Sequence, residues 1–144
     1  MTMNKRILSV SYDRSLLATR QMLLEMQGYT VTSALGFTEA IAQCKTAGFD
    51  LFILGHSIPI KDKRALMRTF KESCPAPILS LERVNEERVP SDFHASPDEP
   101  AKLLRTVKSI TQLALGLKDK NSFALTSTTF SSGLPEQRML PRAE

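Results

Sequence analysis

The feature that most constrains the fold is a repeated alternation of short apolar segments and amphipathic segments between residues 6 and 117. Parallel strands need crossover connections, and those connections are right-handed, so this order predicts an α/β fold with a doubly wound parallel sheet. A ligand crevice is then expected at the carboxyl ends of the strands. Five segments have the composition of strands, at residues 6–10, 29–33, 50–54, 77–81 and 92–95. Helical patterns lie at residues 13–28, 38–47, 62–73 and 99–117.

The connection between the fourth and fifth predicted strands is unusually short. Only nine residues, 82–90, separate Leu81 from Ser91, whereas a crossover between parallel strands usually takes about a dozen. We therefore expect the fourth crossover helix to be shortened to about a turn, or distorted.

The chain of 144 residues is long enough to bury one hydrophobic core, and we predict a single domain at residues 1–117. Residues 118–144 are rich in Ser, Thr and Pro and lack sustained periodicity, which indicates a disordered tail. The N-terminal basic residues precede only four apolar ones, so the segment predicts neither a signal peptide nor a membrane span. A cytoplasmic protein is expected.

Composition argues against several kinds of site. Cys44 and Cys74 form no CxxC pair and have no histidine at ligand spacing, so we expect no disulfide framework and no zinc site. No Gly-rich phosphate loop follows a predicted strand, and no cofactor is expected. The net charge of +4 is too small to indicate nucleic-acid binding by itself.

Several motifs, in this order and spacing, resemble the receiver domains of bacterial two-component response regulators over residues 5–113. They are ILSVSYD at 7–13, GYTVTSA at 28–34, FDLFILGHSIP at 49–59, PILSL at 77–81 and DFHASPDEPAKLL at 92–104. The resemblance implies a CheY-like, flavodoxin-type sheet and a role in, or descent from, phosphorelay signal transduction.

The same resemblance implies that the phosphorylation chemistry has been lost. The family's metal-binding acidic pair aligns with Ser11 and Tyr12, and its phosphoacceptor aspartate aligns with Gly55. Its phosphate-binding hydroxyl aligns with Glu82, and its conserved lysine aligns with Ser96, before Pro97. Neither a metal cage nor a nucleophile is expected, because Mg²⁺ prefers carboxylate oxygens and glycine has no side chain. The family's cis bond before proline predicts a cis Ser96–Pro97 bond.

Two surfaces could carry interactions. Four basic residues form one stripe on the third predicted helix: Lys61, Arg64, Arg68 and Lys71. The stripe is typical of a solvated helix face, and it could also bind an acidic partner or nucleic acid. Three leucines of the last predicted helix, Leu113, Leu115 and Leu117, either cover the edge of the core or pair with a partner.

The sequence thus favours a pseudo-receiver, not an enzyme, that binds a protein partner or itself without phosphorylation. Alternatives are a small flavodoxin-like cofactor-binding protein and a basic nucleic-acid adaptor. His56 and Ser57 follow Gly55 and could act as surrogate phosphoacceptors, but ordinary loop residues are the expectation. His94 is expected to be a plain strand residue, and no Ser/His/acid set for catalysis is predicted.

Overall fold

The computed structural model describes residues 5–46 and 48–121 of the chain, with side chains described as far as Gln112. The chain divides into two parts between Lys108 and Ser109, within the last helix. The predicted tail lies outside the described residues from residue 122 onward. No helix within the described ranges is long and apolar enough to cross a membrane.

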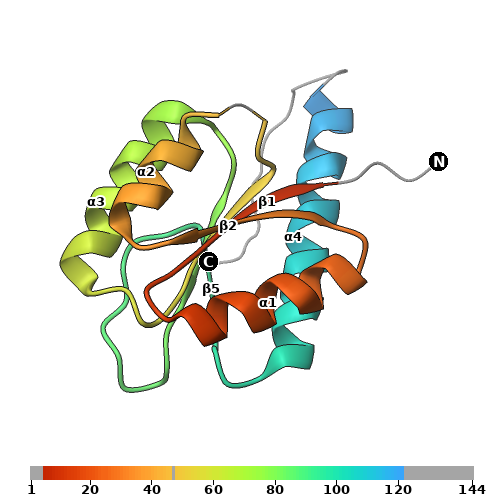
Figure 1. Cartoon of the computed structure of the whole chain (residues 1–144). Coiled ribbons are helices and arrows are strands. Elements are labelled where there is room, and N and C mark those ends of the chain that lie inside the picture. The colour runs from red at the N-terminus through yellow and green to blue at the C-terminus, as the bar shows by residue number, and fades with distance from the viewer. Residues whose placement is uncertain (1–4, 47, 122–144) are drawn as a thin grey trace. The chain divides into compact units, whose positions relative to one another are not determined.

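Five parallel strands form a single sheet, as the sequence predicted (Figure 1). Every pair of neighbours runs parallel, in the order β2-β1-β3-β4-β5. The strands are β1 (Arg6–Ser11), β2 (Thr30–Leu35), β3 (Leu51–Leu54), β4 (Ile78–Leu81) and β5 (Phe93–Ala95). The chain thus winds outward from the centre in both directions, which brings the ends of β1 and β3 together at the middle of one edge.

The crossover helices cover both faces of the sheet, with α2 and α3 on one face and α1 on the other (Figure 1). The helices are α1 (Arg14–Met26), α2 (Phe37–Cys44), α3 (Ile60–Ser73) and α4 (Pro100–Asn121). The second helix is shorter than predicted, and the residue expected at its end, Ala47, lies outside the described residues. The last helix runs beyond its predicted end at residue 117.

Alternating strand residues divide the core between the two faces. On one face, Leu8 and Val10 of β1 belong to a buried cluster with residues of α2 and α3. At its centre the rings of Phe52 and Phe70 stack with centroids 4.4 Å apart. On the other face α1 contributes two buried leucines, Leu17 and Leu24. Both faces are therefore closed to water, as a parallel sheet requires.

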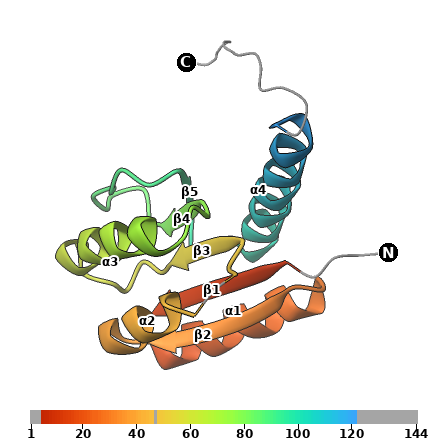
Figure 2. The ribbon, with the colours of Figure 1, turned by 90° about the horizontal axis from the view of Figure 1, so that it is seen from above.

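The connection between β4 and β5 has only a turn at residues 84–85 in place of a crossover helix, in line with the expected shortening to about a turn. The segment 82–92 lies beside α3 (Figure 2). Pro90 lacks the amide hydrogen that a helix needs, and the segment is too short for a full crossover helix. In place of a helix, the side chain of Val89 in this segment covers the sheet, since it is buried in the core cluster.

A core substitution tests this packing. We expect Phe52→Ala to lower the free energy of unfolding by about 3–5 kcal/mol, because it removes a fully buried ring stacked on Phe70. Urea denaturation followed by circular dichroism measures the loss. Val84→Ala is the control, since Val84 is fully exposed and such substitutions change stability by less than about 0.5 kcal/mol. Equal losses in the two variants would contradict the described core.

Candidate functional site

The residues aligned with the family's phosphorylation pocket follow the carboxyl ends of four strands. Ser11 ends β1, and Gly55, Glu82 and Ser96 follow β3, β4 and β5. The backbone brings two pairs of strand ends together. The Gly55 amide donates to the Val10 carbonyl at 2.9 Å, and the Glu82 amide donates to the Ala95 carbonyl at 3.1 Å. The site therefore has a β1–β3 half and a β4–β5 half.

Hydroxyl groups occupy the β1–β3 half. The Ser11 and Ser57 hydroxyl oxygens lie 3.1 Å apart, and the Tyr12 amide donates to Ser57 Oγ at 3.0 Å. The Asp13 amide in turn donates to Ser11 Oγ at 2.9 Å. Ser57 is thus a bridge between the loops that follow β1 and β3, in keeping with its expected role as a loop residue.

The side chains of Tyr12 and Asp13 are both held by other parts of the chain. The Tyr12 hydroxyl donates to Asp62 of α3 at 2.8 Å. Burial and this bond to a carboxylate raise the pKa of Tyr12 far above its ordinary value, so the phenol stays neutral. Asp13 caps α1, accepting a hydrogen bond from the Leu16 amide at 3.0 Å. The two carboxylates near the aligned acidic pair are therefore both engaged, Asp62 by the Tyr12 hydroxyl and Asp13 as a helix cap.

A buried arginine lies against Gly55. Arg20 of α1 is only 6% exposed, and its Nη1 donates to Ser9 Oγ at 2.9 Å and to the Val10 carbonyl at 3.2 Å. No carboxylate of the described residues forms an ion pair with it, and burial lowers its pKa to about 10. A Cβ atom added at Gly55 would lie 2.9 Å from Arg20 Nη2. A guanidinium thus takes the space into which a side chain at residue 55 would point.

Sequence reasoning missed Arg20, although a signal was present. Arg20 lies three residues after Leu17 and four before Leu24, on the apolar side of α1. A charged residue within an apolar stripe indicates a buried polar contact, because an unpartnered buried charge is costly.

The β4–β5 half is built around the Glu82 carboxylate, whose side chain is 3% exposed. Ser80 Oγ donates to it at 2.6 Å, and His94 Nδ1 lies 3.0 Å away. Ser80 and His94 are register partners on β4 and β5, which explains their convergence. Glu82 therefore has its partners within the chain, and His94 is a residue of β5, as expected, whose ring contacts Glu82.

Lys63 of α3 completes this polar cluster. Its Nζ donates to the Leu81 carbonyl at 2.8 Å and lies 3.8 Å from Glu82. Burial lowers the pKa of Lys63, and the charge of Glu82 opposes that shift. Lys63 was also missed by sequence reasoning, although it shares a helical face with Leu66, Met67 and Phe70. This position marks it as an inward-facing lysine.

The structure also places Ser91, His94 and Glu82 in a row, an arrangement that the sequence did not single out. Ser91 Oγ lies 3.4 Å from His94 Nε2, and His94 Nδ1 lies 3.0 Å from Glu82. However, Ser91 Oγ donates its proton to the Phe93 carbonyl at 2.9 Å. A hydroxyl that donates elsewhere is not deprotonated by the imidazole, so this geometry does not activate a nucleophile.

Ser96 is held by a local contact, whereas His56 lies beside the β4–β5 half, where it lines a hollow of about 150 Å³ together with Lys63 and Glu82. Ser96 Oγ accepts a hydrogen bond from the Asp98 amide at 3.1 Å, which closes a local turn. The predicted cis Ser96–Pro97 bond is wrong: every peptide bond of the described residues is trans, the isomer that most X–Pro bonds in folded proteins adopt. His56 Nδ1 is buried without a partner among the described residues, and burial lowers its pKa. Within those ranges, no three His, Cys, Asp or Glu side chains could together hold a metal ion.

The basic stripe of α3 is exposed, and part of it is paired. Arg64 contacts Glu87 at 2.9 Å and Lys71 contacts Asp92 at 2.7 Å, both in the segment between β4 and β5. A groove of about 430 Å³ lies between α3 and this segment, lined by Arg64, Met67, Arg68, Lys71 and Pro90.

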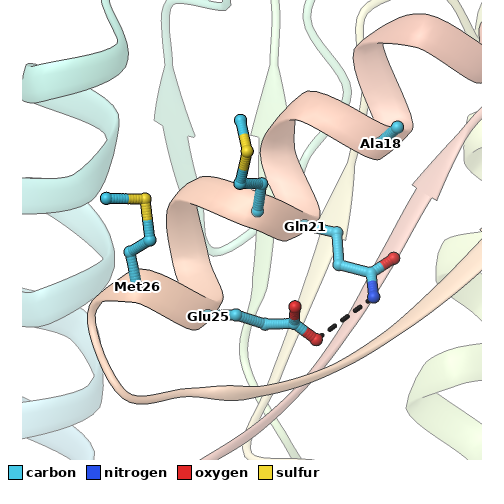
Figure 3. Close-up of a pocket in the computed structure, with 5 residues that line it drawn as sticks. Ala18, Gln21, Glu25 and Met26 are labelled. Atoms are coloured by element: carbon cyan, nitrogen blue, oxygen red, sulfur yellow. Dashed lines mark hydrogen bonds between the residues drawn. The ribbon is translucent and has the colours of Figure 1, made fainter.

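A second exposed surface lies on α1 (Figure 3). Met22 and Met26 are 55% and 74% exposed, and the hollow beside them is lined by Ala18, Gln21 and Glu25 as well. Gln21 donates a hydrogen bond to Glu25 at 3.1 Å across one turn (Figure 3). The side chains of Leu113, Leu115 and Leu117, which we considered as an interaction surface, lie outside the described residues.

Comparisons with solved structures find close likeness in fold. A CheY-like response regulator receiver domain protein from Methanospirillum hungatei has a TM-score of 0.69 and 21% identity, over 80% of this chain and 99% of the other. A two-component response regulator from Clostridium difficile has a TM-score of 0.67 and 21% identity, over 76% and 97%. An adenylate cyclase from Rhodopirellula baltica has a TM-score of 0.68 and 21% identity, over 83% and 96%.

No protein-family model matches the chain, and no curated protein matches it by sequence. The identities to the three solved structures are low, so these likenesses bear on the architecture. The order of the strands, their parallel register and these likenesses lead to one conclusion: the chain has the fold of the CheY-like response regulator receiver domains.

Proposed function

We propose that this protein is a pseudo-receiver, which binds a protein partner without being phosphorylated on aspartate. The observation that carries the proposal is the buried Arg20 guanidinium against Gly55. In the receiver family this place belongs to an aspartate and a divalent cation, as the resemblance implies. Here the chain supplies a fixed positive charge instead.

Electrostatics oppose a metal ion at this position. Two like unit charges 4 Å apart repel by about 4 kcal/mol at an effective dielectric constant of 20, and a divalent ion doubles the effect. Ser11 and Tyr12 offer no carboxylate against this repulsion, and Asp13 caps a helix. The pocket therefore lacks the carboxylate ligands that Mg²⁺ prefers, and the positive charge of Arg20 repels the ion.

The β4–β5 half does not offer a phosphate site either. Glu82 takes the place of the family's hydroxyl, and its carboxylate is bonded to Ser80 and His94. An added phosphoryl group would meet this negative charge. We infer that the polar groups at this edge serve to hold the strands together, that the chain has no catalytic activity of its own, and that it acts in the cytoplasm.

The direct test is incubation with acetyl phosphate and Mg²⁺. We expect intact-mass spectrometry to show no added phosphate, because no aspartate stands at residue 55. Beryllofluoride with Mg²⁺ should not bind. Because a ligand that binds the native state raises the melting temperature, we expect no change in the melting temperature when both are added. An active receiver domain treated in parallel is the positive control. Stoichiometric phosphate would overturn the proposal; acid-labile phosphate would point to a surrogate such as His56, and acid-stable phosphate to Ser57.

A reconstruction tests the role of Arg20. We expect Gly55→Asp alone to remain unphosphorylated, because the new carboxylate would pair with Arg20 rather than with a metal ion. The Gly55 backbone lies outside the left-handed region, so aspartate can adopt its conformation.

Metal binding then depends on removing the arginine. The triple variant Ser11→Asp, Tyr12→Asp, Gly55→Asp should bind Mg²⁺ at least about tenfold more weakly than the same variant carrying Arg20→Met, because the guanidinium repels the ion. Isothermal titration calorimetry with Mg²⁺ measures both affinities. Equal affinities would show that Arg20 does not control the charge of this pocket. Melting curves of both variants check that they are folded.

A further inference from the structure

We propose that the groove between α3 and the segment 82–92 binds an acidic amphipathic helix of a partner protein. This inference rests on the proposed function, because it names the surface and the partner of a phosphorylation-independent binding module. The groove has a volume of about 430 Å³ and opens beside the residues that replace a crossover helix. The other crossovers up to β4 each contain a helix, whereas β4 and β5 are joined by an eleven-residue segment without one.

The charges on α3 match a helix that carries acidic residues. Arg64, Arg68 and Lys71 line the groove at spacings of four and three residues, so they lie on one face over about 10 Å of helix. Glutamates with the same spacing on a partner helix would lie opposite them. Arg68, in the middle, has no hydrogen bond or ion pair with the described residues.

The two flanking cations can exchange partners. Arg64 and Lys71 pair with Glu87 and Asp92, and the four side chains are between 39% and 63% exposed. Surface ion pairs contribute only about 0–1 kcal/mol, so a partner carboxylate can replace them at little cost.

The groove also has an apolar part, which can contact an apolar side chain of a partner protein. Met67 is 8% exposed at the base of the groove, and Pro90 lies on the opposite wall. Methionine is unbranched and adapts its shape, so it suits an apolar residue of an incoming helix. The lining thus combines one apolar patch with a row of cations, which matches an amphipathic acidic helix.

A protein partner fits this groove better than a nucleic acid. None of the five lining residues is aromatic, so the groove lacks the aromatic platform on which single-stranded bases usually stack. Glu87 and Asp92 also lie at its edge and would repel a phosphate backbone.

The experiment uses a designed probe with the full-length protein. The probe is a fluorescein-labelled helical peptide of Glu, Leu and Ala, with glutamates spaced four and three residues apart to match the groove. Fluorescence anisotropy measures its affinity. We expect binding that weakens as NaCl is raised from about 50 mM to about 300 mM, because exposed charges are screened. A peptide with lysine in place of each glutamate should not bind.

Two charge reversals separate the groove from the general charge of the protein. Arg68→Glu should reduce the affinity by roughly tenfold. Arg105→Glu is the matched control, since it makes the same change in net charge at an exposed position on α4; its effect should stay within about twofold. Melting temperatures of both variants show whether each is folded. Met67→Ala, which alters the floor without altering charge, should weaken binding as well.

The outcomes distinguish this inference from the proposed function. Equal losses in Arg68→Glu and Arg105→Glu, or no binding of the acidic peptide, would overturn the groove proposal while the phosphorylation test still decides the pseudo-receiver proposal. Tighter binding of a labelled oligouridine, lost in Arg68→Glu, would also overturn it and point to nucleic acid. Binding of the peptide only when Mg²⁺ and beryllofluoride are present would refute the phosphorylation-independent function itself.

Discussion

The need to cover both faces of a parallel sheet is the constraint on which the rest of this structure depends. Helices meet it on the connections from β1 to β2, from β2 to β3 and from β3 to β4. Between β4 and β5 an irregular segment covers the sheet. It buries Val89 and pairs its acidic side chains with basic residues of α3. The exposed basic face of α3 and the groove beside it follow from this local solution.

The carboxyl edge of the sheet carries buried charged groups whose hydrogen-bond partners come from the chain itself. On the β4–β5 side, the opposite charges of Lys63 and Glu82 are reinforced by neutral donors and acceptors. On the β1–β3 side, Arg20 is held only by a hydroxyl and a carbonyl. Burying such groups is costly unless their hydrogen bonds are made. Apart from His56, whose Nδ1 has no partner among the described residues, the polar groups named at this edge are already bonded, which leaves little to offer a metal ion or phosphate.

The sequence predicted the architecture because the strands are short, apolar and regularly spaced. All five fall within two residues of their predicted positions, as β3 at Leu51–Leu54 illustrates. The missing helix was predicted only in part: the short connection was evident, but the ability of Val89 to cover the sheet depends on tertiary packing. Arg20 and Lys63 lie in apolar helical stripes. Periodicity could have flagged both residues, but their partners depend on how distant strands meet.

The small size of β5 has a consequence for the dynamics of the molecule. This strand has three residues and pairs with β4 alone, at the edge of the sheet. Its side chains are only partly buried, and irregular chain precedes it. Regions with few buried apolar groups open at a lower free energy than the global unfolding transition. Amide hydrogens of β5 should therefore exchange with deuterium through local opening, while those of β1 and β3 exchange only when the whole sheet unfolds.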